Sequence, residues 1–161
     1  MYTVPALLDL HDRAHRSLQS LLAHCAQLGA GELNRELPGF GYPTVRLQLH
    51  HGISAEEYWI GVLQGRPESD DNEAAFRTIE SLAEYRGRIA AATDEYLRRA
   101  SAEELNTARK MLTWGNKEQV LAPARVIVRT LTHIYHHQGQ TLAMCRLLGR
   151  PVAAGLDFPI A

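Results

Sequence analysis

Apolar residues recur at spacings of three and four over four long stretches of the chain, as they do in amphipathic helices. These stretches cover residues 5–28, 44–64, 73–99 and 122–148. Thr44 is a suitable N-cap for the second stretch, and Pro123 and Gly149 suit the two ends of the fourth. We therefore predict an all-α fold, a four-helix bundle with long loops that forms one domain over residues 1–161.

The segments between these helices have weaker patterns. Residues 29–43 hold several Gly and Pro residues and are expected to lack regular structure. Residues 101–104 have the capping-box pattern and predict a short helix that reaches about Leu105. We expect residues 106–121 to be irregular, with a turn over residues 113–117 that could join two short extended pieces.

Three histidines lie close together on the fourth predicted helix. His133 and His137 are four residues apart, which places both imidazoles on one helix face, with Cβ atoms roughly 5–6 Å apart. Both rings could then bind the same cation through Zn–N bonds of about 2.0–2.1 Å. Their face also carries Thr130, whereas His136 shares a more polar row with Arg129. We therefore assign His133 and His137 to the inward face; the alternative is that both make only ordinary hydrogen bonds.

A third imidazole is available on the second predicted helix. His51 lies on the same line as Leu47 and Tyr58, which is the more apolar line and is expected to face the bundle interior, while His50 is expected at the edge of the bundle. One histidine from this helix and two from the fourth make three ligands. That number is found in catalytic zinc sites, which keep one position open for water. Tyr58 could line such a pocket, although a core tyrosine would have the same spacing.

The first predicted helix carries a second pair with this spacing, His11 and His15. It is a rival to the pair on the fourth helix as the centre of a metal site. The simpler interpretation is one partly buried and one exposed histidine. Glu56, on the second helix, is expected to be solvated or hydrogen-bonded to an imidazole.

The composition excludes several classes of function. A net charge of -1 gives no attraction to nucleic acid or to a membrane surface. No apolar run approaches the roughly 18 residues of a membrane helix, and the N-terminus lacks the pattern of a signal peptide. Cys25 and Cys145 lack CxxC spacing and are predicted to be buried thiols in a reducing, cytoplasmic compartment. Eight histidines are an unusual count, and they direct attention to metal chemistry.

Several short motifs occur together along the chain. On the second helix His51 is followed by Glu56 and Trp59, and the sequence GFGYPT leads into that helix. On the fourth, the run HIYHHQGQ at residues 133–140 precedes RLLG at residues 146–149. This pattern resembles the DinB/YfiT-like superfamily over nearly the whole chain.

The resemblance implies a four-helix bundle, often a homodimer, with a three-histidine site for a divalent metal such as nickel or zinc. By position, the metal ligands are His51, His133 and His137. Gln138 stands where the family often has Arg, which argues against a role that needs a cation beside the site. Some relatives are transferases or isomerases that use low-molecular-weight thiols, and others resemble metal-dependent hydrolases.

We expect a metal-dependent enzyme that acts on a small-molecule substrate, with a low-molecular-weight thiol as a candidate cosubstrate. The metal would lower the pKa of a bound water or thiol, toward ~7 for water on zinc, for hydrolysis or thiol transfer. No residue beyond the three ligands is assigned a catalytic role. Two alternatives are a non-catalytic stress protein that binds a metal or small ligand, and a plain bundle with structural histidines. Phe158 and Ile160, as exposed apolar residues, add to the expectation of a homodimer.

Overall fold

The computed structural model describes residues 1–152, 156 and 158–160, and most of the chain is helical. The four long helices are α1 (Val4–Cys25), α3 (Val45–Leu63), α4 (Ile79–Arg99) and α6 (Pro123–Leu147). The connections contain the short helices α2 (Ala30–Leu33) and α5 (Ala102–Asn106) and the strands β1 (Arg109–Thr113) and β2 (Lys117–Leu121). They also contain two single 3-10 turns, η1 (Glu73–Ala75) and η2 (Trp114–Asn116). The predicted all-α bundle is confirmed.

Threonine side chains set where three of the long helices begin. Thr3, Thr44 and Thr78 each accept a hydrogen bond from a first-turn backbone N–H, at 3.3, 3.1 and 3.2 Å. These bonds satisfy N–H groups that have no partner inside the helix. The prediction that the third helix begins at residue 73 is wrong, because Thr78 is extended and its cap starts the helix at Ile79.

A short helix forms within residues 29–43, which we expected to lack regular structure. Its first backbone N–H groups are satisfied locally, since the Glu32 carboxylate accepts a hydrogen bond from the Gly29 N–H at 2.9 Å. Gly and Pro on either side of one helical turn do not prevent this local capping.

Residues 106–121, which we expected to be irregular, contain an antiparallel two-stranded hairpin. Its register pairs Met111 with Gln119 at the centre. The turn uses two consecutive residues with positive φ, Gly115 at 64° and Asn116 at 56°. Gly and Asn tolerate this conformation better than other residues, so they allow the tight reversal.

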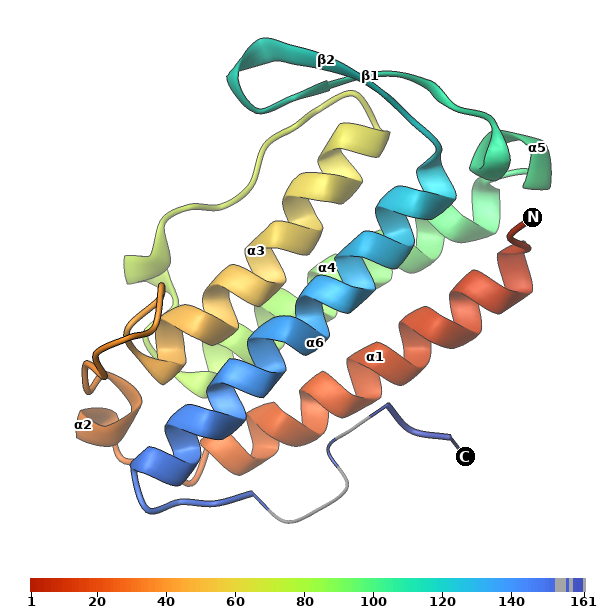
Figure 1. Ribbon diagram of the computed structural model, residues 1–161. Helices are drawn as coiled ribbons and strands as arrows, with labels where there is room; N and C mark the ends of the chain where they lie inside the picture. The colour runs from red at the N-terminus through yellow and green to blue at the C-terminus, as the bar shows by residue number, and fades with distance from the viewer. Residues whose placement is uncertain (153–155, 157, 161) are drawn as a thin grey trace.

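Each long helix packs against two others, as Figure 1 shows. α6 lies against α1 and α3, and α4 contacts the same two helices. Their apolar faces enclose one continuous core, which includes Leu7, Leu21, Ile53, Leu82 and Ile134. Where α3 meets α6, a methyl group added to Gly52 would lie 3.6 Å from His137 Cβ. His137 therefore lies at a close contact between these two helices.

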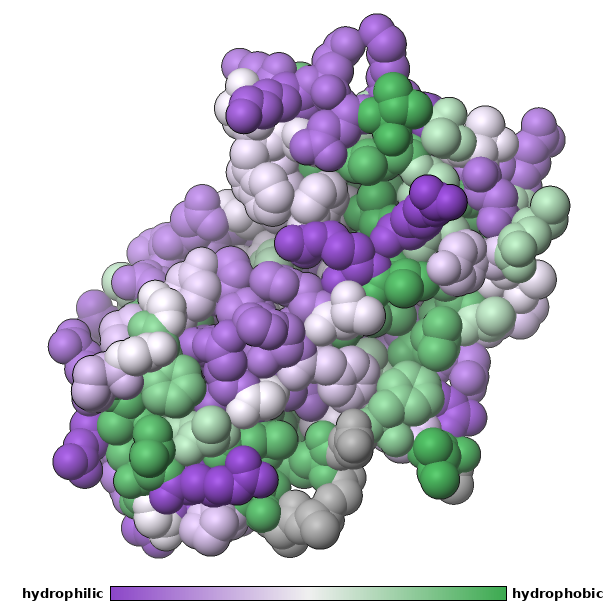
Figure 2. All heavy atoms as spheres, viewed as in Figure 1, coloured by the Kyte–Doolittle hydropathy of each residue, from purple (hydrophilic) through white to green (hydrophobic). Residues whose placement is uncertain are grey.

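The surface combines polar and apolar regions. In Figure 2, hydrophilic side chains gather over the middle of α3 and α6, and hydrophobic atoms are visible toward the hairpin end. Leu112, Trp114 and Val120 are the exposed large apolar side chains of the hairpin. Phe158 and Ile160 are 37% and 94% exposed, so pairing could still cover them. No helix within the described residues is long and apolar enough to cross a membrane.

Candidate metal centre

Three imidazoles from two helices converge where α3 and α6 meet. His133 Nε2 lies 3.2 Å from His51 Nε2. The His137 ring centroid lies 4.6 Å from that of His51 and 4.4 Å from that of His133. Tetrahedral Zn–N bonds of about 2.0–2.1 Å would separate two ligand nitrogens by roughly 3.3 Å. Since one nitrogen of each ring lies within 4.8 Å of the other two, the three residues could hold one ion together.

A chain of hydrogen bonds fixes the orientation of His137. The buried Gln48 amide nitrogen donates to the Gln140 side-chain oxygen at 2.7 Å and to the Tyr42 carbonyl at 3.0 Å. The Gln48 oxygen is therefore the acceptor for His137, whose Nδ1 lies 2.7 Å away. His137 Nδ1 must carry the proton, which leaves the Nε2 lone pair available to a metal.

The segment before α3 supplies one wall of the site. Tyr42 stacks on His51, with ring centroids 4.0 Å apart and an interplanar angle of 19°. It also meets the His137 ring edge-on, at a centroid distance of 5.9 Å. His136, by contrast, is exposed, and the Gln140 amide donates to its Nε2 at 2.7 Å. The polar row predicted this difference between the adjacent histidines.

Burial favours the neutral form of all three imidazoles. It is the largest cause of the lowered pKa at His51, His133 and His137, and the Arg129 charge lowers each pKa further. The pKa falls to about 4 for His133 and about 3 for His137. Neutral imidazole is the form that binds a metal, so protons compete weakly for these nitrogens near neutral pH.

A pocket of about 250 Å³ opens beside two of the three histidines, His51 and His133. Aromatic rings make much of its wall, because Tyr58 stacks on Trp114 with centroids 4.2 Å apart and an interplanar angle of 2°. Arg129 also lines it. A ligand or water molecule in this pocket would lie next to the imidazoles. The arrangement therefore provides the open side that a catalytic metal site needs.

Sequence reasoning did not find every residue of this site. It did not single out Gln48 or Tyr42, and it grouped Arg129 with the polar row of His136 instead of with the pocket. The available signal was spacing, since Arg129 precedes His133 by four residues, a distance that brings side chains onto one helix face. Trp114 gave no such signal, because it lies in the turn of a hairpin that was expected to be irregular.

A second group of ligand-type side chains lies in the bundle interior. His11 Nε2 is 3.1 Å from Glu56 Oε1, and His15 Nε2 is 2.9 Å from Glu56 Oε2. The Thr93 hydroxyl donates to Oε1 at 2.7 Å. Both α1 histidines are buried, at 4% and 5% exposure, so the prediction that one is exposed is wrong. The hydrogen bond between Glu56 and an imidazole is confirmed, and this group could also hold a metal ion.

Charges in the second group are balanced without an ion. Arg86 Nη1 lies 3.5 Å from His15 Nδ1, and a guanidinium can only donate. His15 Nδ1 therefore presents its lone pair to Arg86, and the His15 proton sits on Nε2, facing Glu56. Burial by itself would raise the pKa of Glu56, but the contacts with His15 and His11 hold this pKa far below its usual range.

Comparison with known families agrees with this geometry. A family model described as the DinB superfamily matches residues 13–141. This range covers most of the chain and includes His51, His133 and His137. The chain belongs to the DinB superfamily.

Two solved structures resemble this DinB fold. The crystal structure of a DinB-like protein from Bacillus cereus ATCC 10987 has a TM-score of 0.77 and 18% identity, over 96% of this chain and 99% of that one. A conserved protein from Enterococcus faecalis has a TM-score of 0.54 and 19% identity, over 92% of this chain and 99% of that one. At these identities the likeness shows a shared fold. No curated protein matches the chain.

Gln138, which stands where DinB proteins often have Arg, does not line the histidine pocket. It is buried, and its side-chain oxygen accepts a hydrogen bond from the Ser17 hydroxyl of α1 at 3.0 Å. The cation at the pocket comes from Arg129 instead. The departure at Gln138 therefore does not deprive the site of a nearby positive charge.

His50 occupies a different environment from its neighbour His51. It is buried, with its ring centroid 5.1 Å from that of Phe76 and 5.8 Å from that of Tyr85. The expectation that His50 lies at the edge of the bundle is wrong, because Tyr85 of α4 and Phe76 cover that side of α3. His50 is thus a core residue of the DinB bundle and lies outside the three-histidine group.

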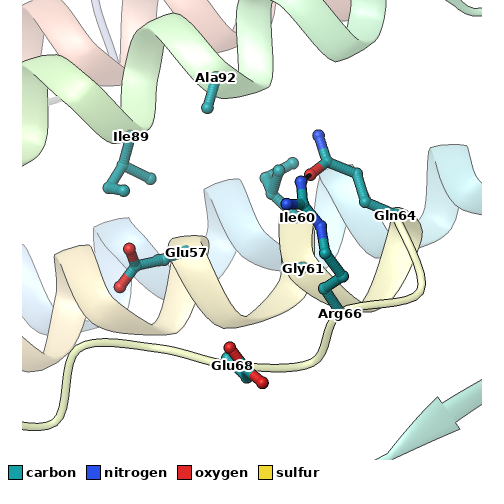
Figure 3. A pocket seen from close by; sticks show the side chains of 8 residues that line it. All are labelled: Glu57, Ile60, Gly61, Gln64, Arg66, Glu68, Ile89 and Ala92. Atoms are coloured by element: carbon teal, nitrogen blue, oxygen red, sulfur yellow. Dashed lines mark hydrogen bonds between the residues drawn. The ribbon is translucent and has the colours of Figure 1, made fainter.

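Figure 3 shows another pocket of the DinB bundle, of about 260 Å³, lined by residues of α3, α4 and the loop after α3. Its polar groups are partly paired with one another, since Arg66 donates to the Gln64 side-chain oxygen at 2.8 Å. The Glu57 carboxylate accepts hydrogen bonds from the Tyr85 hydroxyl and the Asp70 N–H. No histidine or cysteine is among its described lining residues. Among its described lining residues this pocket therefore offers carboxylates but no imidazole or thiolate ligand.

Proposed function

We propose that this protein is a divalent-metal-dependent enzyme in which His51, His133 and His137 bind the ion, with nickel and zinc as the leading candidates. The observation that carries the proposal is the convergence of three imidazoles beside an open pocket. Structural zinc sites fill four positions with protein ligands, whereas catalytic sites keep one position open. Three histidines next to a pocket correspond to the second kind of site.

An ion bound here would lower the pKa of a water molecule or thiol in the pocket, which suits hydrolysis or transfer to a low-molecular-weight thiol. The residues of the chain prepare the site for this role. Gln48 holds His137 in the tautomer with its Nε2 lone pair free, and Tyr42 stacks on His51. Burial and the Arg129 charge keep the imidazoles unprotonated.

The group at Glu56 supports a metal less well than the three histidines do. A metal at His15 Nε2 would have to displace the proton that Arg86 favours there, and the guanidinium would repel the ion. We propose that this group is structural. Its hydrogen bonds join α1, α3 and α4 through Glu56, His11, His15 and Thr93.

The direct test is the metal content of protein purified without an affinity tag, followed by assays of hydrolysis and thiol transfer on small molecules. About one ion per chain, with activity that is lost on chelation and restored by the metal, would support the proposal. One ion per chain without any activity would favour a non-catalytic metal-binding protein. No bound metal and no change of melting temperature with added metal would leave a bundle whose histidines are structural.

A further inference from the structure

The pocket beside the histidines contains polar groups that metal binding does not use. The Tyr58 hydroxyl and the Trp59 indole N–H are buried, and neither donates to an acceptor in the part of the chain that the structure describes, although the Trp114 backbone N–H interacts with the Tyr58 oxygen. Both side chains line the pocket, and they are 5% and 6% exposed. A buried donor without an acceptor costs about as much free energy as a lost hydrogen bond. Two such donors in one pocket wall indicate a ligand that carries hydrogen-bond acceptors.

Each of these two residues is covered by an exposed side chain of the same pocket. The Trp114 ring, 58% exposed, lies flat on Tyr58. The Arg129 guanidinium lies over the Trp59 ring, 5.0 Å from its centroid. A flat ligand that inserts between these covering side chains and the wall would meet aromatic faces, both donors and the guanidinium together.

Arg129 provides a positive charge that is not held in an ion pair with any carboxylate of the described residues. Arginines elsewhere form ion pairs with an acid four residues earlier, for example Arg13 with Asp9 and Arg98 with Asp94. The residues four positions from Arg129 are instead Arg125 and His133. Among the described residues Arg129 has no ion pair within 4.0 Å, and its contact with Trp59 is a cation–π interaction. Its charge is therefore free to bind an anion.

We propose that this pocket binds a small planar carboxylate, with the carboxylate on Arg129 and the Trp59 N–H and the planar part against Tyr58 and Trp114. The proposal rests on the proposed function, because it names the substrate class of the same site. A volume of about 250 Å³ suits a ligand of one ring, just below the roughly 300–1,000 Å³ of typical ligand pockets. Since Arg129 and His133 are one helical turn apart, a carboxylate on Arg129 places the rest of the ligand beside the metal ligands.

Asp71 adds a negative charge to the pocket and so restricts where an anionic group can bind. It lies in the lining, and its carboxylate accepts a hydrogen bond from the Ser69 hydroxyl at 2.8 Å. A negative charge there repels an anion that comes near it, so the ligand should carry its carboxylate on the Arg129 side. Neutralising Asp71 should consequently strengthen the binding of a simple anion, whereas neutralising Arg129 should weaken it.

The test uses benzoate as the probe and benzamide as its neutral counterpart of the same shape. Affinities are measured by equilibrium dialysis with the metal-loaded and the metal-stripped protein. Tryptophan fluorescence reports the location, because the chain has two tryptophans, Trp59 and Trp114, and both line the pocket. We expect benzoate to change this fluorescence saturably and to bind about tenfold more tightly than benzamide.

Variants assign the effect to Arg129. Arg129→Gln should weaken benzoate binding about tenfold in both forms of the protein, with little effect on benzamide. Arg125→Gln is the matched control, since Arg125 is also exposed on α6 but does not line the pocket. Asp71→Asn should tighten benzoate binding about two- to threefold. Exposed positions tolerate these substitutions, and circular dichroism would confirm that each variant is folded.

Equal binding of benzoate and benzamide, or equal benzoate affinities of Arg129→Gln and Arg125→Gln, would overturn the carboxylate proposal. An Arg129 effect that vanishes in the metal-stripped protein would also overturn it, because benzoate would then be binding only to the metal. Metal analysis of the purified protein tests the proposed function separately from these binding measurements. If the purified protein contains no metal but binds benzoate through Arg129, the carboxylate proposal would stand and the proposed metal-dependent function would be wrong.

Discussion

His11–His15 on α1 and His133–His137 on α6 have the same spacing, but each pair meets a different third group. The α6 pair meets the imidazole of His51 beside an open pocket. The α1 pair meets the carboxylate of Glu56 in the bundle interior. A neutral imidazole can donate its ring lone pair directly to a metal ion, so three converging imidazoles form a set of metal ligands. A carboxylate accepts hydrogen bonds from imidazole N–H groups, and Glu56 Oε1 accepts them from His11 and His15 without an ion, while Glu56 Oε2 makes no hydrogen bond among the described residues.

The two histidine pairs also differ in the group that contacts the Nδ1 atom of one of their rings. Behind His137 lies the Gln48 oxygen, an acceptor, which draws the ring proton to Nδ1 and frees Nε2. Behind His15 lies the Arg86 guanidinium, a donor, which draws the lone pair to Nδ1 and leaves the proton on Nε2. The comparison teaches that the spacing brings two rings together, while the neighbour of each ring decides whether it binds a metal or donates a hydrogen bond.

The largest expected difference between the two pairs is in metal binding. His137→Ala removes one of three ligands and should weaken metal binding by more than about a hundredfold, beyond the effect of removing a supporting residue. His15→Ala, at the matching position of the other pair, should leave the metal content unchanged. Metal per chain is measured by elemental analysis after dialysis.

His136→Ala and His50→Ala serve as further controls, because both histidines lie outside the three-histidine group. Each should retain the metal. If His15→Ala loses the metal and His137→Ala retains it, then the α1 pair binds the metal and the α6 pair is structural.

The second expected effect concerns stability. Glu56→Gln replaces one acceptor oxygen by a donor that faces imidazole N–H groups, and it leaves Arg86 without its compensating charge. We expect the free energy of unfolding to fall by about 3 kcal/mol, because a buried hydrogen-bond network is broken and the Arg86 charge loses its compensation, with unchanged metal content. Chemical denaturation measures the change. Glu84→Gln, an exposed glutamate of α4, should change the stability by less than about 0.5 kcal/mol, and a similar loss in both variants would contradict the structural role of Glu56.

The third effect tests the group behind His137. Gln48→Leu removes the acceptor for Nδ1 and should weaken metal binding by about 10- to 100-fold, through loss of the tautomer and the ring orientation. Gln48→Glu keeps an oxygen acceptor and should retain most of the affinity. Competition with a metal-binding dye gives both values. Equal affinities for the Leu and Glu variants would show that Gln48 acts only through packing.

The smallest effect is the pH dependence of the Glu56 contribution. The folded-state pKa of Glu56 lies below the ordinary value of 4.5, so its stabilisation is present above pH 4.5 and is lost as the pH falls further. Below that pH, the free energy of unfolding should fall more steeply in the wild type than in Glu56→Gln, by up to about 1.4 kcal/mol per pH unit for one proton. Denaturation of metal-stripped protein at several acidic pH values measures this. Parallel curves would indicate that the pKa of Glu56 in the folded protein is not below its ordinary value.

Local sequence signals predicted those parts of the fold that local chemistry controls. The ends of α3 were predicted to within one residue, because Thr44 caps its start and Gly65 follows its end. The start of α4 was predicted too early, because Phe76 fits the apolar periodicity of a helix. In the structure Phe76 lies in a non-helical segment before α4, and its side chain is buried in the core. The turn of the hairpin was expected, with two short extended pieces on either side, but the paired strands were not predicted as regular structure, because they have few buried side chains and therefore no clear alternation.

The three-histidine group was expected from spacing and from family resemblance, and the structure brings its members together. Its surroundings were not predicted. Gln48 lies on α3 and contacts His137 of α6, and Trp114 reaches the pocket from the turn of the hairpin; nothing in their local sequence indicates a role. Arg129 was assigned to a polar row, because an exposed arginine on a helix is usually solvated and its position in a pocket depends on the neighbouring elements.

The sequence by itself determined which side chains share a helix face, because the α-helix advances by about 100° per residue whatever surrounds it. It therefore brought His133 beside His137 and His11 beside His15. By the same rule, five residues on α3 separate the directions of His51 and Glu56 by about 140°. Which helix lies in each direction was decided only by the tertiary structure, since packing joins segments far apart in the chain. Because α6 lies toward His51 while α1 and α4 lie toward Glu56, one histidine pair forms the candidate metal site and the other a buried hydrogen-bond network.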